Sequence, residues 1–298
     1  MEFDKKEINS PFRYAGGKFY ARKLILEQLP KHDFYIEPFA GGASIFFAKP
    51  KATTSWLNDI DEELINCLIN IRDNVEDLIE FLEGIPAKKE LHGYYKNEFK
   101  PKNSLERAGR WYYLNRTSYS GIMNMKNCYW GYGEKYSMRP ENWPRHLRKC
   151  SSKLQNVIIT NLTYREVIDQ APDGAFLFVD PPYFNADQDK FYTHSFIKDT
   201  HYELEEALRF NSDRLKFLLT YDNTQEVRDM YWWCNILEKE WNYTISRTDD
   251  QTKKKDESQE EIKKKGTRSK GKEIFMLNYE SPVLLKEESK SSDELFIG

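Results

Sequence analysis

Apolar runs of strand length recur along the chain and alternate with segments whose apolar residues repeat at helical spacing. We predict strands over 33–39, 52–59, 156–162, 174–180, 215–222 and 273–279. The apolar spacing predicts helices over 21–29, 61–83 and 201–210. Strands that alternate with helices indicate an α/β fold, in which a mostly parallel sheet is covered by helices on both faces. In such sheets, ligands bind beyond the carboxyl ends of the strands.

The wide spacing of the four cysteines and the lack of long apolar runs argue against a zinc module, a disulfide-rich protein and a membrane-spanning protein. The chain has 298 residues, enough for one large domain or for one domain with an insertion. Its cysteines lack the paired spacings of a zinc site or redox pair: Cys67, Cys128, Cys150 and Cys234. No apolar run reaches about 18 residues, and the first ten residues lack a secretory-signal pattern. We therefore expect a cytoplasmic protein without a membrane span.

Charge is distributed unevenly, although the formal net charge is only −3. Residues 84–157 hold nine Lys and six Arg against five Glu and no Asp, which is a net charge of +10. The same segment contains twelve aromatic residues. Because cations neutralise phosphates and aromatic rings stack on bases, this composition favours a nucleic-acid partner. A solvated basic surface over a small aromatic core is the alternative.

Two segments near the end of the chain are too polar to order themselves. Residues 247–272 carry ten basic and six acidic residues, and Ile262 is their single large aliphatic side chain. Such a segment buries too little apolar surface to offset its loss of conformational entropy. We predict a flexible loop over 247–272 and a loose tail over 281–298.

Two strands end in motifs that suit a nucleoside-containing ligand. After the first comes Glu37-Pro-Phe-Ala-Gly-Gly-Ala-Ser44, whose glycines let the backbone approach a ligand before a helix begins. This motif is neither the dinucleotide fingerprint G-x-G-x-x-G nor a P-loop. The next strand ends at Asn58-Asp59, where an acid commonly accepts hydrogen bonds from ribose hydroxyls. An ordinary turn and a helix N-cap are the structural alternatives.

A third motif, Asp180-Pro-Pro-Tyr183, follows a buried strand and suits methylation of an amino group. An exocyclic amine on a base is a poor nucleophile because its lone pair is delocalised into the ring. The Asp180 carboxylate and the Pro181 carbonyl can accept its N–H groups and direct its lone pair toward an electrophile. Pro181 and Pro182 stiffen the turn, and Tyr183 offers a ring on which an extruded base can stack.

Other base chemistries fit the sequence less well. Methylation at carbon 5 of cytosine needs a cysteine nucleophile, familiarly after a proline, and none of the four cysteines follows a proline. Zinc deamination needs closely spaced cysteine and histidine ligands, which this sequence also lacks. We predict no metal site and give none of the five histidines a role.

These motifs resemble those of the Dam-type, D12 class DNA adenine-N6 methyltransferases, in the order called the α group. Pro11-Phe-Arg-Tyr-Ala-Gly-Gly-Lys18 resembles the family's N-terminal cofactor motif, and Tyr35-Ile-Glu-Pro-Phe-Ala-Gly-Gly42 resembles its S-adenosylmethionine loop. Asp180-Pro-Pro-Tyr183 resembles its catalytic motif. The resemblance covers roughly 11–280 and implies a Rossmann-like S-adenosylmethionine-dependent methyltransferase sheet with one antiparallel strand near its end. It also implies an inserted target-recognition domain.

The resemblance further implies a division of the chain and roles for single residues. Residues 1–83 and 158–280 would form the catalytic domain, and 84–157 the DNA-binding insertion. The catalytic residues would be Asp180, Pro181, Pro182 and Tyr183. Contacts with the cofactor S-adenosylmethionine would come from Tyr14, Lys18, Glu37, Phe39, Gly41, Asp59 and Asp180. Lys18 would face the methionine carboxylate and Asp59 the ribose.

Within the insertion, 114–124 resembles the family's recognition hairpin. Tyr119 matches an aromatic residue that wedges into the base stack, and Arg116, Ser120 and Asn124 are candidate DNA contacts. Asn124 stands where members that methylate GATC carry an arginine. Asparagine suits adenine whereas arginine suits guanine, so the target need not be GATC. A turn residue in a different hairpin is the alternative for Asn124.

The sequence therefore predicts transfer of a methyl group from S-adenosylmethionine to N6 of an adenine flipped out of double-stranded DNA. Cytosine-N4 methylation poses the same chemical problem and stays open. So do RNA adenine-N6 methylation and an inactive DNA-binding homologue. We expect a monomer, with a cognate restriction endonuclease as a partner if the chain belongs to a restriction–modification pair.

Overall fold

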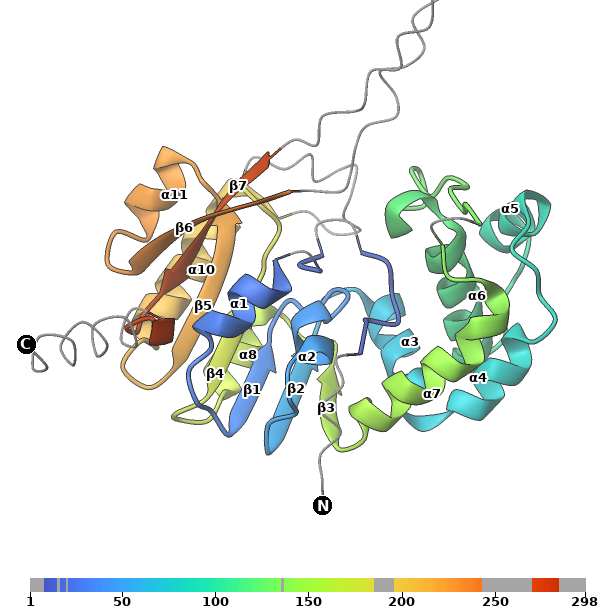
Figure 1. Cartoon of the computed structure of the whole chain (residues 1–298), viewed down its shortest axis with the longest axis horizontal. Helices are drawn as coiled ribbons and strands as arrows, with labels where there is room; N and C mark the ends of the chain where they lie inside the picture. Colours follow the sequence, from blue (N-terminus) through green and yellow to red (C-terminus); the bar gives the residue numbers. More distant parts are fainter. Residues whose placement is uncertain are drawn as a thin grey trace, which may run out of the picture.

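The computed structural model describes residues 8–14, 17–19, 21–134, 137–184, 196–242 and 270–283. Within these residues the strands form one sheet of seven, in the order β3-β2-β1-β4-β5-β7-β6. Their bounds are β1 Phe34–Glu37, β2 Thr54–Asn58, β3 Val157–Thr160, β4 Phe176–Val179, β5 Lys216–Asp222, β6 Asn235–Asn242 and β7 Lys270–Leu277. Strands β1 to β5 pair in parallel, whereas β7 runs antiparallel to both β5 and β6. The single antiparallel strand near the sheet's end is confirmed (Figure 1).

All six predicted strands are present, and β6 is a further strand that the apolar pattern missed. In β6 the charged run Glu238-Lys239-Glu240 interrupts the apolar pattern, as is common for a strand at the edge of a sheet. The predicted helix over 61–83 is two helices, α3 Glu62–Asp73 and α4 Val75–Leu82. They separate at Asn74, whose φ of −131° and ψ of 39° are not helical.

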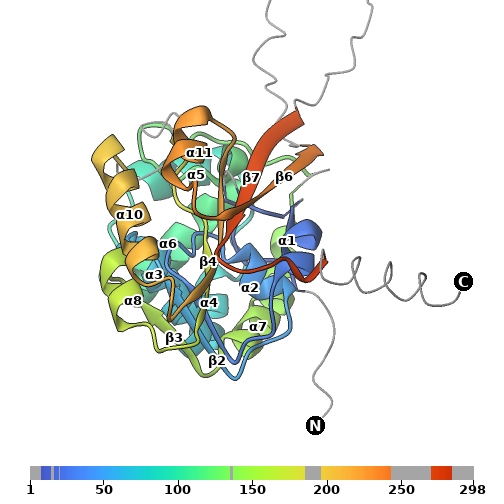
Figure 2. The ribbon, with the colours of Figure 1, turned by 90° about the vertical axis from the view of Figure 1, so that its left-hand side faces the viewer.

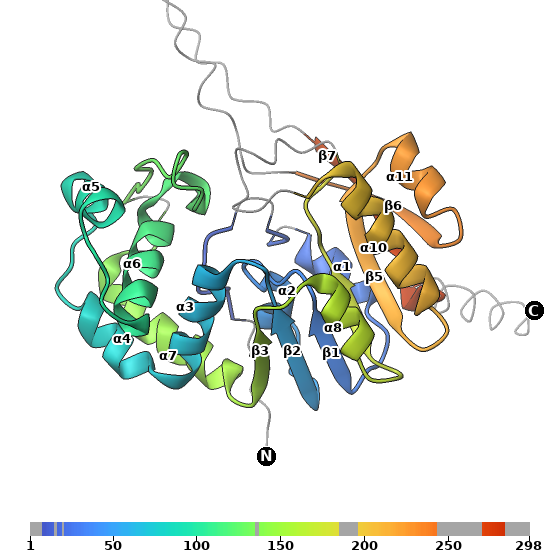
Figure 3. The ribbon, with the colours of Figure 1, turned by 180° about the vertical axis from the view of Figure 1, so that it is seen from behind.

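The remaining helices flank the sheet or follow one another beyond its β3 edge. Their bounds are α1 Arg22–Gln28, α2 Ser44–Ala48, α5 Lys89–Asn97, α6 Ser104–Thr117, α7 Trp143–Leu154, α8 Tyr164–Gln170, α10 Lys198–Phe210 and α11 Gln225–Met230. Two short 3-10 turns, η1 Tyr119–Gly121 and η2 Pro140–Asn142, complete the order. Helices α4 to α7 gather beside β3, away from α10 and α11 (Figures 1 and 3).

Two apolar cores lie on opposite faces of the sheet because successive strand residues point to opposite sides. In β4, Phe176 and Phe178 enter one core, and Leu177 and Val179 enter the other. The first core contains side chains from α1, α2, α3, α6 and α7, and the second contains side chains from α8, α10 and α11. Helices α1 and α2 accordingly stand in front of the sheet in Figure 1, and α8 and α10 in Figure 3. The edge-on view shows these layers in Figure 2.

The first core continues without a break from the sheet into the helices between β2 and β3. Leu57 of β2, Leu64 of α3, Tyr112 of α6 and Leu154 of α7 belong to the same buried cluster. The division of the chain at residue 84 therefore stays a prediction. The sheet and the helices beside β3 share one hydrophobic interior, so they are expected to move together.

The segments at the end of the chain fall partly outside the description. Most of the predicted 247–272 loop lies outside the described residues, but 270–272 already belong to β7. Of the tail, residues 281–283 are described, and the Ser281 hydroxyl donates to Gln28 Oε1 at 2.5 Å. In the part of the chain that the structure describes, no helix is both long and apolar enough to cross a membrane.

Candidate active site

Asp180 stands at the carboxyl end of β4, the middle strand of the sheet. Its Oδ1 accepts a hydrogen bond from the Thr220 hydroxyl at 2.6 Å and lies 2.7 Å from the Lys18 ammonium. Thr220 belongs to the neighbouring strand β5, so the sheet itself fixes one oxygen of the carboxylate. The side chain of Asp180 keeps 20% of its surface exposed, whereas that of Lys18 keeps 3%. The carboxylate thus has one anchored oxygen and an accessible side.

Lys18 links the N-terminal motif to the catalytic motif. Besides Asp180, its ammonium lies 3.9 Å from Glu273 Oε2 and 4.8 Å from the centre of the Tyr183 ring. A buried ammonium needs such partners, since desolvation of an unpaired charge is costly. The resemblance places Lys18 near the cofactor, and the structure brings its ammonium directly to the Asp180 carboxylate.

Glu273 is a site residue that the sequence reasoning missed. It is 2% exposed, and burial raises its pKa from 4.5 to about 7, against the lowering influence of Lys18 and the Tyr183 hydroxyl. Glu273 begins the apolar run of β7 and pairs in register with Asp222, the last residue of β5. Because β7 is antiparallel, the start of this strand reaches the edge where the parallel strands end. The sequence shows an acid at the start of the final strand, but only the antiparallel direction of β7 places that acid beside Lys18 and Asp180.

The Asp180-Pro-Pro-Tyr183 turn after β4 is held at both ends. Asp180 is fixed by Lys18 and Thr220, and the backbone N–H of Phe184 donates to Asp222 Oδ1 at 3.1 Å. Tyr183 between them is half-buried, and its ring centre lies 6.0 Å from that of Tyr221. These contacts give the turn a defined conformation before any ligand binds.

The glycine motif after β1 is built around Tyr14. Gly41 has a φ of +46°, and a Cβ placed there would lie 2.9 Å from Tyr14 Cε1, so a side chain at 41 would be both strained and crowded. The Gly41 N–H donates to Asp59 Oδ2 at 2.8 Å, and the Asp61 N–H donates to Asp59 Oδ1 at 3.0 Å. Asp59 therefore joins the ends of β1 and β2 in one loop cluster. The N-cap of α3 is Asp61, which accepts from the N–H groups of Glu63 and Leu64.

Glu37 is buried, whereas Phe39 is half-buried. Glu37 is 1% exposed and its Oε1 accepts from the Tyr35 hydroxyl at 2.7 Å and the Phe46 N–H at 2.8 Å. Burial raises the Glu37 pKa to about 8. Its described contacts join β1 to α2. Phe39 stacks on Tyr164, with ring centres 5.4 Å apart.

The turn after α6 carries three of the four candidate DNA contacts. Tyr119 is 40% exposed, and Ser120 has a φ of +52°. Asn124 lies in a turn in which its Oδ1 accepts from the Lys126 N–H at 3.1 Å, and its contact with DNA stays a prediction. Arg116, the fourth candidate, is 6% exposed, and its guanidinium donates to the Pro11 carbonyl at 3.4 Å, so a contact with DNA would require this side chain to leave its buried position. Arg116 lies on the inward side of α6 and anchors the N-terminal segment.

The aromatic residues of the basic segment divide between surface and core. Trp111, Tyr112 and Trp143 are buried in the first core. Tyr129 is 61% exposed and lies under the Lys96 ammonium, 5.2 Å from its ring centre. One set of rings therefore builds a core and a smaller set reaches the surface, where stacking on bases stays a prediction. Among the described residues, no group of three or more His, Cys, Asp or Glu side chains forms a candidate metal site.

A mostly parallel sheet with an acid-Pro-Pro-Tyr turn at the end of its middle strand defines the class of Rossmann-like methyltransferases. Residues 14–245 match the family described as D12 class N6 adenine-specific DNA methyltransferase. The chain belongs to this family and is a DNA adenine-N6 methyltransferase.

Named relatives agree with this family. The chain is 29% identical to the Type II methyltransferase M1.LlaDCHI of Lactococcus lactis subsp. cremoris, over 69% of this chain and 77% of that protein. It is 28% identical to the Type II methyltransferase M.MjaIII of Methanocaldococcus jannaschii, over 67% and 76%. It is 25% identical to the DNA adenine methylase of Escherichia coli strain K12, over 85% and 94%. The match with the E. coli protein therefore extends over most of both chains.

Proposed function

We propose that this enzyme methylates N6 of an adenine flipped out of double-stranded DNA, with S-adenosylmethionine as the methyl donor. The observation that carries the proposal is Asp180, a carboxylate with one oxygen anchored by Lys18 and Thr220 and a partly exposed side chain at the end of the middle strand. An anchored acceptor is what a poorly nucleophilic amine needs in order to be held in one orientation.

The residues around this carboxylate fit the cofactor. Gly41, Tyr14 and Asp59 form a close-packed loop in which each Asp59 oxygen accepts one backbone N–H, and a carboxylate oxygen can accept a second bond from a ribose hydroxyl. Asp180 and Glu273 lie beside the Lys18 ammonium, and burial raises the pKa of Glu273 to about 7, so a cationic ligand close by would favour the ionised form of Glu273. When bound, S-adenosylmethionine supplies an electrophilic methyl group on a sulfonium.

The protein's own contribution is to bind and orient the amine. Asp180 and the Pro181 carbonyl would accept the two N–H groups of the adenine amine, so that its lone pair faces the methyl group. Tyr183 would stack on the flipped base. The proton that leaves the methylated amine would pass to Asp180, which already accepts its hydrogen bond. Every step uses positioned groups and no covalent enzyme intermediate.

The exposed residues beside the site would bind the duplex. Tyr119 would enter the base stack, Ser120 and Asn124 would contact the DNA beside it, and the basic segment 84–157 would bind phosphates. We propose that a monomer suffices. Two relatives carry Type II names and one is named DNA adenine methylase. If a gene beside this one encodes a restriction endonuclease for the same target, that endonuclease is the proposed partner.

The test compares Asp180→Ala with the matched control Asp173→Ala. Asp173 lies in the turn before β4 with 86% of its side chain exposed, so the same substitution there should leave activity unchanged. Each protein is incubated with S-adenosylmethionine labelled in the methyl group and with unmethylated duplex DNA, and the nucleosides are separated by chromatography. We expect label in N6-methyladenine for the wild type and the control, and none for Asp180→Ala.

DNA affinity, measured by fluorescence anisotropy, should stay within a few fold in Asp180→Ala, because the basic surface is untouched. Retained turnover in this variant would contradict the catalytic assignment of Asp180. Label confined to N4-methylcytosine would overturn the choice of base. Label on RNA in preference to duplex DNA would overturn the choice of polymer.

A further inference from the structure

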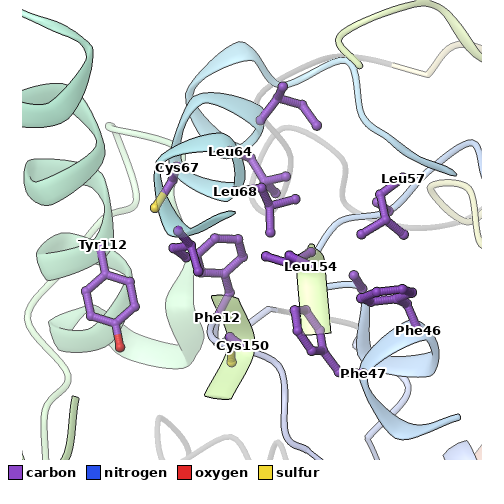
Figure 4. Packing of buried hydrophobic residues seen from close by; sticks show 14 of the residues in the cluster. Phe12, Phe46, Phe47, Leu57, Leu64, Cys67, Leu68, Tyr112, Cys150 and Leu154 are labelled. Atoms are coloured by element: carbon purple, nitrogen blue, oxygen red, sulfur yellow. The ribbon is translucent and has the colours of Figure 1, made fainter. Parts of the chain in front are cut away.

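The N-terminal segment, residues 8–14, lies on α6 and α7, the helices before and after the turn 118–121 that carries Tyr119, which we call the recognition turn. Its Phe12 packs edge-on against Trp111 of α6, with ring centres 4.6 Å apart. Its Asn9 carbonyl lies 3.0 Å from His146 Nε2 of α7. Figure 4 shows Phe12 among Leu68, Cys150 and other side chains of the first core. The segment is therefore seated in the interior of the helical part before it continues to the site.

One buried amide makes the central contact between this segment and α6. Asn115 is fully buried, its Oδ1 accepts from the Arg13 N–H at 2.9 Å, and its Nδ2 donates to the Arg13 carbonyl at 2.8 Å. The same Nδ2 donates to the Gly121 carbonyl at 3.3 Å. A single side chain thus satisfies both backbone groups of Arg13 and also binds the recognition turn. Buried backbone groups need such partners, so the geometry is strongly constrained.

Arg13 also contacts the recognition turn directly. Its guanidinium donates to the Ser118 carbonyl at 3.1 Å. Gly121 has a φ of +71°, and a Cβ there would lie 2.2 Å from the Arg13 carbonyl oxygen. The backbone of Arg13 and the end of the turn are therefore in van der Waals contact. Tyr119 and Ser120 lie between Ser118, whose carbonyl accepts from Arg13, and Gly121, whose carbonyl accepts from Asn115.

The other end of the same segment reaches the reaction centre. Tyr14, the next residue after Arg13, packs against Gly41 of the cofactor loop. Lys18, four residues further on, pairs with Asp180 at 2.7 Å. Residues 8–14 therefore contact both the turn that carries the proposed DNA wedge and the proposed cofactor loop. Close-packed contacts pass a displacement on because they deform little.

We infer that Asn115 is a positioning residue that couples DNA recognition by the Tyr119 turn to the arrangement of Tyr14 against the proposed cofactor loop. The inference rests on the proposed function and adds a link between its two ligands. When the turn shifts to admit Tyr119 into the base stack, the Asn115 amide moves the Arg13 backbone with it. Cofactor and cognate duplex should then each raise the affinity for the other by the same factor, because coupling between two sites is reciprocal.

The test measures this coupling factor in Asn115→Asp. The substitution keeps the shape and the acceptor for the Arg13 N–H, but it replaces the Nδ2 donor by an oxygen that faces two carbonyls. The matched control is Asn70→Asp: Asn70 is 1% exposed on α3, and its Nδ2 donates to the Asn66 carbonyl and to Ser104, away from the N-terminal segment. Binding of S-adenosylhomocysteine, which cannot donate a methyl group, is followed by calorimetry with and without an oligonucleotide that carries the mapped target sequence. Binding of the same oligonucleotide is then followed with and without S-adenosylhomocysteine.

We expect the wild type and Asn70→Asp to show coupling of at least about fivefold, equal in both directions. In Asn115→Asp the factor should fall toward one. If Asn115→Asp does not fold, Arg13→Gln removes only the contact with the Ser118 carbonyl and should lower the same factor.

A wild type that methylates DNA with a coupling factor of one would overturn the inference, as would Asn115→Asp or Arg13→Gln with coupling unchanged. A wild type that binds no cofactor and transfers no methyl group would instead overturn the proposed function. The two failures are therefore distinguishable in the same set of proteins.

Discussion

The buried carboxyl of Glu273 should make the stability of this protein fall as pH rises, and Glu273→Gln should remove that effect. Its pKa is raised from 4.5 to about 7, chiefly by burial. Between these values the folded protein holds a proton that the unfolded chain releases, so the free energy of unfolding falls with pH. At 1.36 kcal/mol per pH unit, the loss across this window amounts to about 3 kcal/mol.

The sign follows from the direction of the pKa shift. The contribution of Glu273 is fully present below pH 4.5 and is lost as the pH rises through about 7. Glutamine cannot ionise and has nearly the same shape, so Glu273→Gln should match the wild type at low pH. It should then become more stable than the wild type as the pH increases, by up to about 3 kcal/mol.

Urea unfolding followed by circular dichroism at several pH values from 4.5 to 8 measures this difference. Glu166→Gln is the control with the opposite sign. The pKa of Glu166 is lowered by its hydrogen bonds with Thr163 in the capping box of α8, so this substitution should cost stability at neutral pH. A difference between Glu273→Gln and the wild type that does not change with pH would refute the reasoning, and so would one that favours the wild type as the pH rises.

Two further substitutions test other parts of the molecule. Tyr119→Ala should weaken binding of the target duplex about tenfold or more and leave cofactor affinity unchanged, because its ring is 40% exposed and lies at the surface. Titrations with each ligand check this, and a loss of cofactor affinity would show that the turn has another role. Gly109→Ala should lower the free energy of unfolding by about 1–3 kcal/mol through overpacking, since its Cβ would lie 2.2 Å from Phe81 Cδ1. Unchanged stability in Gly109→Ala would mean that Phe81 moves aside at little cost.

Much of the sheet could be predicted from the sequence because its strands are short, apolar and locally patterned. The runs that became β1, β4 and β5 are buried on both faces, so their composition alone marks them as strands of a covered sheet. The edge strand β6 was not predicted because a strand with no neighbour on one side tolerates charged residues that interrupt the apolar pattern. The break at Asn74 escaped because both helices around it bury the same kind of apolar face.

The candidate site was predictable only where a motif is contiguous. Asp180-Pro-Pro-Tyr183 carries its chemistry within four adjacent residues, and its place after a buried strand is visible in the sequence. The burial of Arg116 could not be predicted, because a basic residue in a basic segment gives no sign of which side of its helix faces inward. Its burial against the Pro11 carbonyl depends on a segment about a hundred residues earlier.

By itself, the sequence determined the α/β class, six strands and the amino-methylation motif, since each depends on neighbours within a few residues. The tertiary structure alone decided that Lys18 pairs with Asp180, that Glu273 joins them from an antiparallel strand, and that Asn115 holds Arg13. These contacts join residues far apart in the chain, and their existence depends on strand order and direction. Local patterns do not encode that order, because many arrangements of the same strands would bury the same apolar residues.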